Sequence, residues 1–173
     1  FESHRPAPGA PAPEPPPGPA ATRDGTRIAL RANINLLSEL AAARRLGAEG
    51  IGLYRTEFPF LIRATFPSEE EQYLIYRQLF DGLGAAPLTI RTLDVGGEKV
   101  LAYAPAGEQA NPELGLRSIR FALRHRHIFD QQLRAILRAA RAGSRLRIMF
   151  PMISSLDEFR EARRAVDQNL ERL

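Results

Sequence analysis

The 173 residues suffice for one domain with a sizeable core, or for part of a larger one. A hydrophobic content of 44%, a charged content of 25% and no long apolar run are typical of a globular protein without a membrane segment or signal peptide. The chain has no cysteine, which excludes disulfides and thiolate metal sites and favours a cytoplasmic location.

The formal net charge of +4 does not by itself predict a nucleic-acid surface. Basic residues are interspersed with acidic ones, as in EFREARRAV (158–166), which is typical of helix faces with opposite charges at helical spacing. We therefore expect no nucleic-acid partner. Of the 24 basic residues only Lys99 is a lysine, which makes it a candidate for a specific chemical role.

Residues 1–22 hold eight of the 14 prolines and few residues that can pack in a core. Proline fixes φ and removes a backbone donor, so this segment is expected to be an extended, stiff linker or a disordered tail. A docking peptide for a proline-binding partner is the alternative. Residues 23–173 are expected to form the folded domain.

The hydrophobic pattern of the folded part predicts strands and helices in alternation. The expected strands are 27–34, 51–55, 88–94 and 146–152. The expected helices are 36–47, 67–84, 113–124, 127–142 and 155–173. This order predicts parallel strands joined by right-handed crossovers, in either a doubly wound sheet or part of a (β/α)8 barrel.

Three helix boundaries have local signals. Ser68 with Glu71, and Ser155 with Glu158, fit the capping box, in which the side chain of each residue bonds the backbone of the other. Gly47 is expected to end the first helix, because glycine adopts the left-handed conformation that follows many helices.

Charged residues gather where the predicted strands end. Arg55 ends one strand, Arg91 and Asp94 lie at the end of the next, and Lys99 follows in GGEK. In a barrel, functional groups lie at these ends, and no glycine-rich nucleotide-binding motif supports a doubly wound sheet, so the pattern favours a barrel fragment. Converging guanidinium groups predict an anion site, unless each arginine pairs with an acid, Arg55 with Glu57 or Arg91 with Asp94.

Five segments in order, GIGLYRTEFPF, FPSEEEQYLIYRQLF, RTLDVGGEK, NPELGLRSIR and FPMISSLDEFREARR, resemble the phosphoenolpyruvate-utilising enzymes. Within them the chain is similar to enzyme I of the bacterial phosphotransferase system, the phosphoenolpyruvate-protein phosphotransferases, and most to the nitrogen-related branch. The resemblance covers residues 24 to 167. It implies the N-terminal half of a TIM-type (β/α)8 barrel that binds phosphoenolpyruvate (PEP).

The resemblance implies that such an enzyme transfers the phosphoryl group of PEP to a histidine on a separate domain, releasing pyruvate, and then to a phosphocarrier protein of the HPr type. The family's phosphate-binding arginines fall on Arg55, Arg91 and Arg117, with Lys99 as a fourth cation. Residues 96–117 have the composition of a lid. A homodimer through the barrel domain is also implied.

Other family features have no counterpart here. The resemblance implies Mg²⁺, but the family's metal ligands and its acid cysteine would lie beyond residue 173, and the segment of the phosphorylated histidine is absent. His4, His125 and His127 are expected to be surface residues. We therefore expect no catalytic residue in this chain, and the fragment alone to be inactive. A phospho-ligand sensor without catalysis and a dimerisation module are the alternatives.

Overall fold

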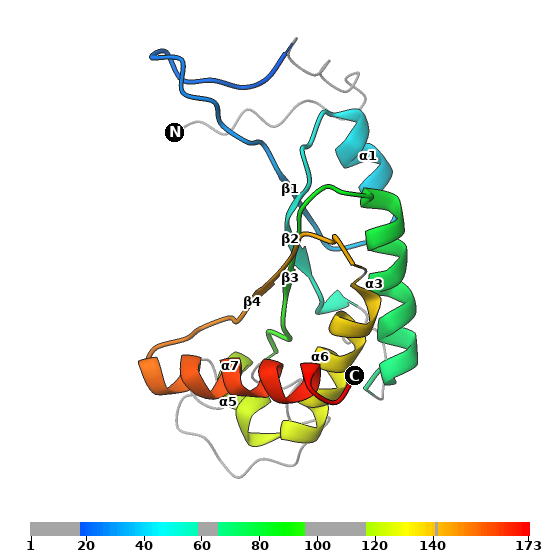
Figure 1. Cartoon of the computed structure of the whole chain (residues 1–173), viewed down its shortest axis with the longest axis vertical. Coiled ribbons are helices and arrows are strands. Elements are labelled where there is room, and N and C mark those ends of the chain that lie inside the picture. The colour runs from blue at the N-terminus through cyan, green and yellow to red at the C-terminus, as the bar shows by residue number, and fades with distance from the viewer. Residues whose placement is uncertain (1–17, 59–65, 96–116, 141) are drawn as a thin grey trace.

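The structure is a computed structural model and describes residues 18–58, 66–95, 117–140 and 142–173. These residues form an α/β fold with four strands and five helices (Figure 1). The strands are β1 (Ala32–Ile34), β2 (Ile51–Arg55), β3 (Leu88–Arg91) and β4 (Leu146–Met149). The helices are α1 (Glu39–Arg45), α3 (Glu69–Leu83), α5 (Ser118–Arg124), α6 (Arg126–Ala139) and α7 (Leu156–Leu170).

The four strands form one parallel sheet in the order β1-β2-β3-β4, as the alternating pattern predicts. Each strand therefore lies beside the next strand in the sequence, and each connection carries at least one helix. This order is consistent with a partial barrel, in which successive strands are neighbours.

The first strand is shorter than predicted. It begins at Ala32, and Arg27 instead forms an isolated antiparallel bridge with Ala21. A turn explains the difference, because the Gly25 N–H donates to the carbonyl of Thr22 and the Ile28 N–H donates to the carbonyl of Ala20. The prediction of a strand from residue 27 was wrong, since this local turn takes the hydrogen bonds that the sheet would need.

The third and fourth strands also end early, at Arg91 and Met149. The Thr92 N–H still donates to the carbonyl of Met149, but the next N–H, that of Leu93, donates to the side chain of Gln132 on α6. The hydrogen-bond ladder between β3 and β4 stops after Thr92 because the Leu93 N–H bonds the side chain of Gln132 in place of a backbone carbonyl of the neighbouring strand.

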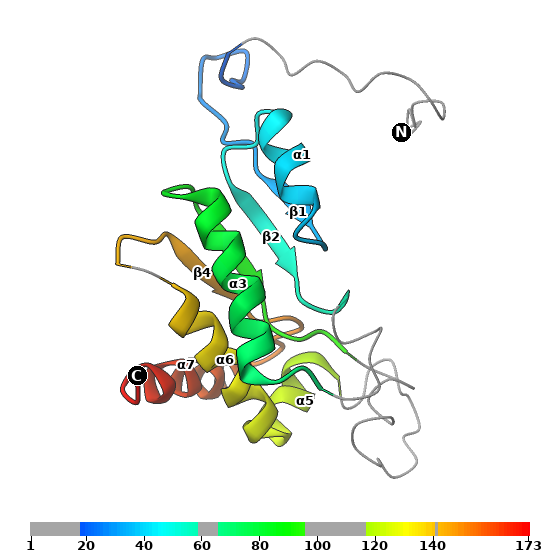
Figure 2. The ribbon, with the colours of Figure 1, turned by 90° about the vertical axis from the view of Figure 1, so that its right-hand side faces the viewer.

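Helices α1, α3 and α6 lie along one face of the sheet (Figure 2). The strands send alternate side chains to this face, except in β2, where a shift in register between Ile51 and Tyr54 lets both enter the core although they are three positions apart. The core between the sheet and these helices contains Ile34, Leu40, Ile51, Tyr54, Tyr76, Leu79, Leu88, Ile90 and Ile136. None of the described helices covers the opposite face, where Asn33 and Arg147 are exposed.

The local helix signals are confirmed. The side chains of Ser68 and Ser155 accept hydrogen bonds from the N–H groups of Glu71 and Glu158, and both capping boxes are complete. Helix α1 ends at Arg45, and Gly47 follows with a φ of 80°.

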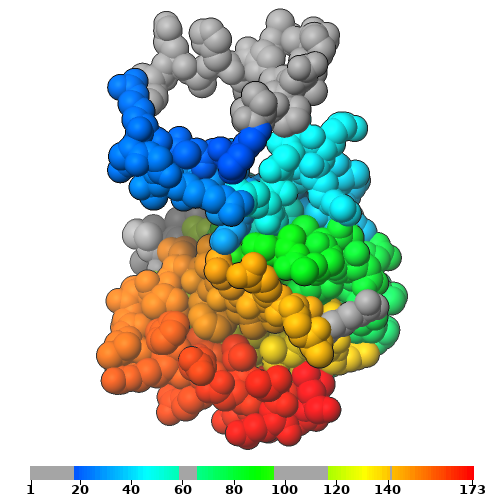
Figure 3. Space-filling view, turned by 45° about the horizontal axis from the view of Figure 1, so that its top comes forward, coloured from blue at the N-terminus to red at the C-terminus, as the bar shows by residue number. Residues whose placement is uncertain are grey.

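The segment from residue 18 to β1 lies at the end of the molecule opposite α7 (Figure 3). Its Arg27 guanidinium and its Leu30 N–H both bond the carboxylate of Glu49. The predicted tail of residues 1–22 lies almost wholly outside the described residues, and its boundary stays a prediction. No helix in the described ranges is long and apolar enough to cross a membrane.

Candidate functional site

Two of the predicted site residues are neighbours at the ends of the strands. Arg55 and Arg91 are the last residues of β2 and β3, and their Cα atoms are partners in the sheet register. Parallel pairing therefore brings them to the same rim, as the sequence predicts. Arg55 is exposed, whereas Arg91 is half-buried.

Arg117 reaches the same rim from another direction. It directly precedes α5, and its Nη2 lies 3.7 Å from Oδ1 of Asp94, three residues after the end of β3. Nη1 of Arg91 lies 3.2 Å from the other oxygen, Oδ2, of the same carboxylate. The two arginines therefore share Asp94. Lys99 and most of the proposed lid lie outside the described residues.

A second carboxylate, that of Glu57, faces Arg91 from the segment that directly follows β2. Nε and Nη2 of Arg91 lie 3.0 and 2.9 Å from Oε1 of Glu57. Of the two ion pairs named as the alternative to an anion site, Arg91–Asp94 is present, whereas Glu57 pairs with Arg91 and not with Arg55. Among the described residues the structure gives Arg55 no ion pair. The side chains of Arg91, Glu57 and Asp94 are only 19%, 12% and 17% exposed.

The described charges at this rim do not cancel. Arg91 and Arg117 pair with the two carboxylates of Glu57 and Asp94, and Arg55 at the end of β2 adds a third guanidinium, which leaves one positive charge among the described rim residues when all five are ionised. Burial raises the pKa of Glu57 above its usual value, although Arg91 opposes the shift. The surplus guanidinium among the described residues suits the rim to an anion.

A buried glutamine supports the rim from the helix side. The Nε2 group of Gln132, on α6, donates to Oγ1 of Thr56 at 3.3 Å, while its Oε1 accepts from the Leu93 N–H at 2.9 Å. The Thr56 hydroxyl in turn donates to the carbonyl of Arg91 at 3.0 Å. Sequence analysis missed Gln132. The available signal was a glutamine among the apolar residues of an amphipathic helix.

Gln132 also bonds a buried tyrosine. Its Nε2 lies 3.4 Å from the hydroxyl of Tyr76, which donates to Gln72 at 3.3 Å. Burial raises the pKa of Tyr76, and it raises the pKa of the adjacent Tyr54 to about 12. Both phenols therefore stay neutral over the physiological range, and that of Tyr76 acts as a hydrogen-bonding group.

Two residues at the rim adopt left-handed backbone conformations. Ser118 and Met152 have φ values of 52° and 57°, which are uncommon for residues with a Cβ. The buried Ser118 hydroxyl donates to the Asp94 carboxylate, and its N–H donates to the carbonyl of Val95 at 2.9 Å. Sδ of Met152 lies 3.3 Å from the same hydroxyl oxygen. These contacts hold Asp94 in place beside Arg117.

The described histidines, His125 and His127, make no hydrogen bond or ion pair with the described residues of this cluster. His125, expected at the surface, is half-buried, with its ring 4.4 Å from that of Phe121. Burial, with smaller effects of His127 and Arg124, lowers the pKa of His125. His127 is exposed, as expected. His4 lies outside the described residues.

The described residues do not fit a metal site on their own. Within residues 18–58, 66–95, 117–140 and 142–173 no group of three or more His, Cys, Asp or Glu side chains is placed to hold an ion. The two rim carboxylates, Glu57 and Asp94, are both paired with Arg91. The Mg²⁺ implied by the resemblance therefore stays a prediction, with no step assigned to it here.

Residues 15–173 match the family model "PEP-utilising enzyme, PEP-binding domain". A phosphoenolpyruvate-protein phosphotransferase of Haemophilus influenzae is 46% identical over 149 residues, which are 86% of this chain and 26% of that protein. The Staphylococcus aureus protein of the same name is 45% identical over 152 residues, which are 88% of this chain and 26% of that protein. A multiphosphoryl transfer protein of Rhodobacter capsulatus is 48% identical over 150 residues, which are 87% of this chain and 18% of that protein. The chain thus spans about a quarter or less of these relatives.

Proposed function

Because the chain belongs to the PEP-binding domain family of the PEP-utilising enzymes, we propose that its rim of arginines binds the phosphate of PEP. The whole protein is then a phosphoenolpyruvate-protein phosphotransferase, which transfers the phosphoryl group to an enzyme histidine and on to a phosphocarrier protein, releasing pyruvate. The observation that carries the proposal is the convergence of Arg55, Arg91 and Arg117 at one rim, with more positive than negative charge.

The chemistry of the rim suits a phosphoryl group. A guanidinium is planar and always charged, and its N–H donors match two phosphate oxygens at once. Phosphoryl transfer requires positioning and stabilisation of charge on these oxygens more than covalent help from the protein. Two carboxylates hold Arg91 before a ligand arrives, so its side chain loses little conformational entropy when the ligand binds.

Several finer features belong to the same proposal. Lys99 provides a fourth cation to the phosphate, and the carrier is of the HPr type. The whole enzyme uses Mg²⁺ through ligands outside these 173 residues, forms a homodimer through the barrel domain and belongs to the nitrogen-related branch. These features rest on the resemblance of the motifs, with the names of the relatives supporting the phosphotransferase activity.

The binding half of the proposal is tested by titration of the isotope-labelled chain with PEP, followed by NMR. Two or three charge-assisted contacts, less the entropy of fixing the ligand, predict a dissociation constant of about 1 mM. The largest shifts are expected at Arg55, Arg91, Asp94 and Arg117. Pyruvate is the matched control, since it lacks the phosphate, and it should shift these signals far less. Equal shifts with both ligands, or shifts confined to other surfaces, would overturn the proposal.

The catalytic half is tested with the chain alone. The 173 residues contain no cysteine and no GGxxSH-type histidine segment, so mixing them with PEP, Mg²⁺ and the carrier protein should give no pyruvate above background. Pyruvate release that scales with the concentration of this chain would show that the chemistry has been placed on the wrong residues.

A further inference from the structure

We infer that Glu57 is a positioning residue, which fixes the guanidinium of Arg91 in the orientation that receives the phosphate. The inference deepens the proposed function and rests on it. The carboxylate of Glu57 lies beside the proposed phosphate site, where its negative charge should repel the ligand. Its presence there therefore requires a reason other than charge attraction.

The geometry supplies that reason. One oxygen of Glu57, Oε1, lies 3.0 Å from Nε and 2.9 Å from Nη2 of Arg91, so it contacts one edge of the guanidinium at two points. Oδ2 of Asp94 lies 3.2 Å from Nη1, the remaining nitrogen of the guanidinium. Two carboxylates on different segments thus contact all three nitrogens, which fixes both the position and the plane of the group.

Glu57 is itself held to the strand that carries Arg91. The preceding residue, Thr56, is 1% exposed, donates its hydroxyl hydrogen to the carbonyl of Arg91 and accepts a hydrogen bond from Gln132. The backbone before Glu57 is therefore tied to the backbone of Arg91 across two adjacent strands. Consequently, the Glu57–Arg91 distance is set by the sheet and not by two free surface side chains.

The ionised form of Glu57 is disfavoured by its surroundings, since burial raises the pKa of its carboxyl. A buried charge that opposes the ligand and is costly to ionise is typical of a residue retained for geometry. Two accounts of Glu57 then make opposite predictions. If only its charge mattered, its removal would strengthen anion binding, whereas loss of a positioning residue weakens anion binding.

The test compares two variants that remove the same charge. Glu57→Ala removes the acceptor as well, whereas Glu57→Gln keeps an oxygen that can still accept from Nε of Arg91. Glu171→Ala, at the exposed end of α7, is the control for the change in net charge. Each protein is titrated with inorganic phosphate and with PEP, and its melting temperature is measured to verify folding.

We expect Glu57→Ala to weaken the affinity for both ligands about fivefold or more, and Glu57→Gln to stay within about twofold of the parent chain. The NMR signal of the Arg91 Nε–H should be slow to exchange with water in the parent and in Glu57→Gln, and fast in Glu57→Ala. This signal reports on the position of Arg91 without any ligand. A parent chain with a protected signal and no phosphate binding would contradict the proposed function but not the positioning of Arg91.

The inference is overturned if Glu57→Ala binds phosphate as tightly as the parent or more tightly, or if the Nε–H of Arg91 exchanges fast in the parent chain. If Glu57→Ala does not fold, the phosphate affinity and the Arg91 Nε–H exchange of Glu57→Gln test the positioning role. Tighter phosphate binding by Glu57→Gln, or loss of the protected Nε–H signal in that variant, would contradict the positioning role.

Discussion

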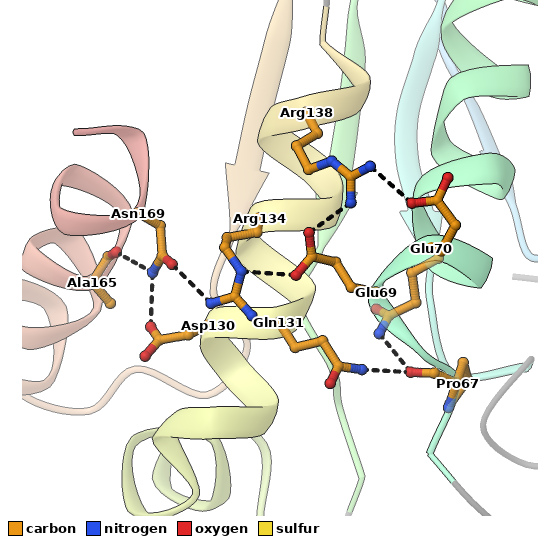
Figure 4. Close-up of polar contacts among 10 residues, drawn as sticks. Pro67, Glu69, Glu70, Asp130, Gln131, Arg134, Arg138, Ala165 and Asn169 are labelled. Carbon is orange, nitrogen blue, oxygen red and sulfur yellow. Dashed lines mark hydrogen bonds and ion pairs between the residues drawn. The ribbon is translucent and has the colours of Figure 1, made fainter. Parts of the chain in front are cut away.

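The rim of the sheet and the outer face of the helices both carry a cluster of arginines and carboxylates, but their charge balance differs. At the rim, Arg91 and Arg117 pair with Glu57 and Asp94, and Arg55, the register partner of Arg91, adds a third guanidinium that has no ion pair among the described residues. On the helices, Arg126, Arg134 and Arg138 face Asp130, Glu69 and Glu70, so that three positive charges meet three negative ones. Figure 4 shows the contacts of Arg134 and Arg138 with Glu69 and Glu70. One cluster is electropositive and the other is balanced.

The balanced cluster joins three helices. Arg134 and Arg138 of α6 bond the carboxylate of Glu69 on α3 at 2.8 and 2.6 Å. Arg134 also donates to Oδ1 of the fully buried Asn169 on α7, whose amide donates to Asp130 at 2.7 Å (Figure 4). Each group there has a partner within the protein, which indicates a structural role.

The comparison shows that ion pairs alone do not distinguish a binding site from a structural contact, since both clusters contain them. The surplus of charge does distinguish them, because an anion can complete the rim but would disturb the helix network. The predictions below test whether the two clusters differ in this way, in order of decreasing effect.

The largest effect on stability is expected in the helix network. Asn169→Ala leaves Asp130 and Arg134 with fewer partners in a buried setting and should lower the free energy of unfolding by about 3 kcal/mol. Urea unfolding measures the change. Leu170→Ala, at the exposed neighbouring position on α7, is the control and should cost less than about 0.5 kcal/mol. An Asn169→Ala protein as stable as its control would show that the network does not join the helices.

Gln132 links the two regions, because its helix belongs to the structural layer and its hydrogen bonds reach the rim. Gln132→Leu keeps the bulk but leaves the Leu93 N–H and the Thr56 hydroxyl with one partner fewer, at a cost of about 2 kcal/mol. It should also weaken phosphate binding. Gln131→Leu, which loses one bond to the carbonyl of Pro67, is the matched control. Unchanged phosphate affinity in Gln132→Leu would show that the hydrogen bonds of Gln132 do not affect the rim.

Salt should affect the two clusters unequally. Raising the ionic strength from about 0.05 to 0.5 M shortens the screening length and should weaken phosphate affinity about threefold, because the ligand meets a surplus charge at an accessible rim. The free energy of unfolding should change much less, since the helix network has no net charge. Calorimetric titration and urea unfolding at both salt concentrations measure the two responses. Equal responses would argue against the difference in charge balance.

The smallest effect concerns pH and His125. Its pKa is lowered mainly by burial, so the folded state binds fewer protons than the unfolded state below pH 6.5. Stability should therefore fall as the pH falls through this range. His125→Gln should reduce this loss between pH 7.5 and 5.5, whereas His127→Gln, at the exposed neighbour, should largely retain it. Thermal unfolding across this range measures the slope, and an unchanged slope in His125→Gln would contradict the assignment.

Features set by neighbouring residues could be predicted from the sequence. Both capping boxes involve residues three apart, and the Arg91–Asp94 pair, which the sequence offered as the alternative to an anion site, also spans three positions. The parallel sheet followed from the alternation of strands and helices. The strand expected from residue 27 failed for an equally local reason, since the turn around Gly25 was not recognised.

Features that depend on the register between distant segments could not be predicted. Glu57 and Arg91 are 34 positions apart, and Thr56 and Gln132 are 76 apart. Their contacts depend on how β2, β3 and α6 align, which no local pattern specifies. The left-handed backbone of Ser118 is another example, because neither serine nor its neighbours favour that conformation.

The central claim is that the rim, and not arginine clusters in general, binds the phosphate of PEP. Arg91→Ala and Arg138→Ala remove the same charge, one from the rim and one from the helix network, so titrating both variants with PEP tests the claim most directly. Arg91→Ala should weaken binding at least about tenfold, because a guanidinium held at the end of a strand is lost. Arg138→Ala should leave the affinity within about twofold of the parent. Unchanged affinity in Arg91→Ala, or an equal loss in both variants, would contradict the claim.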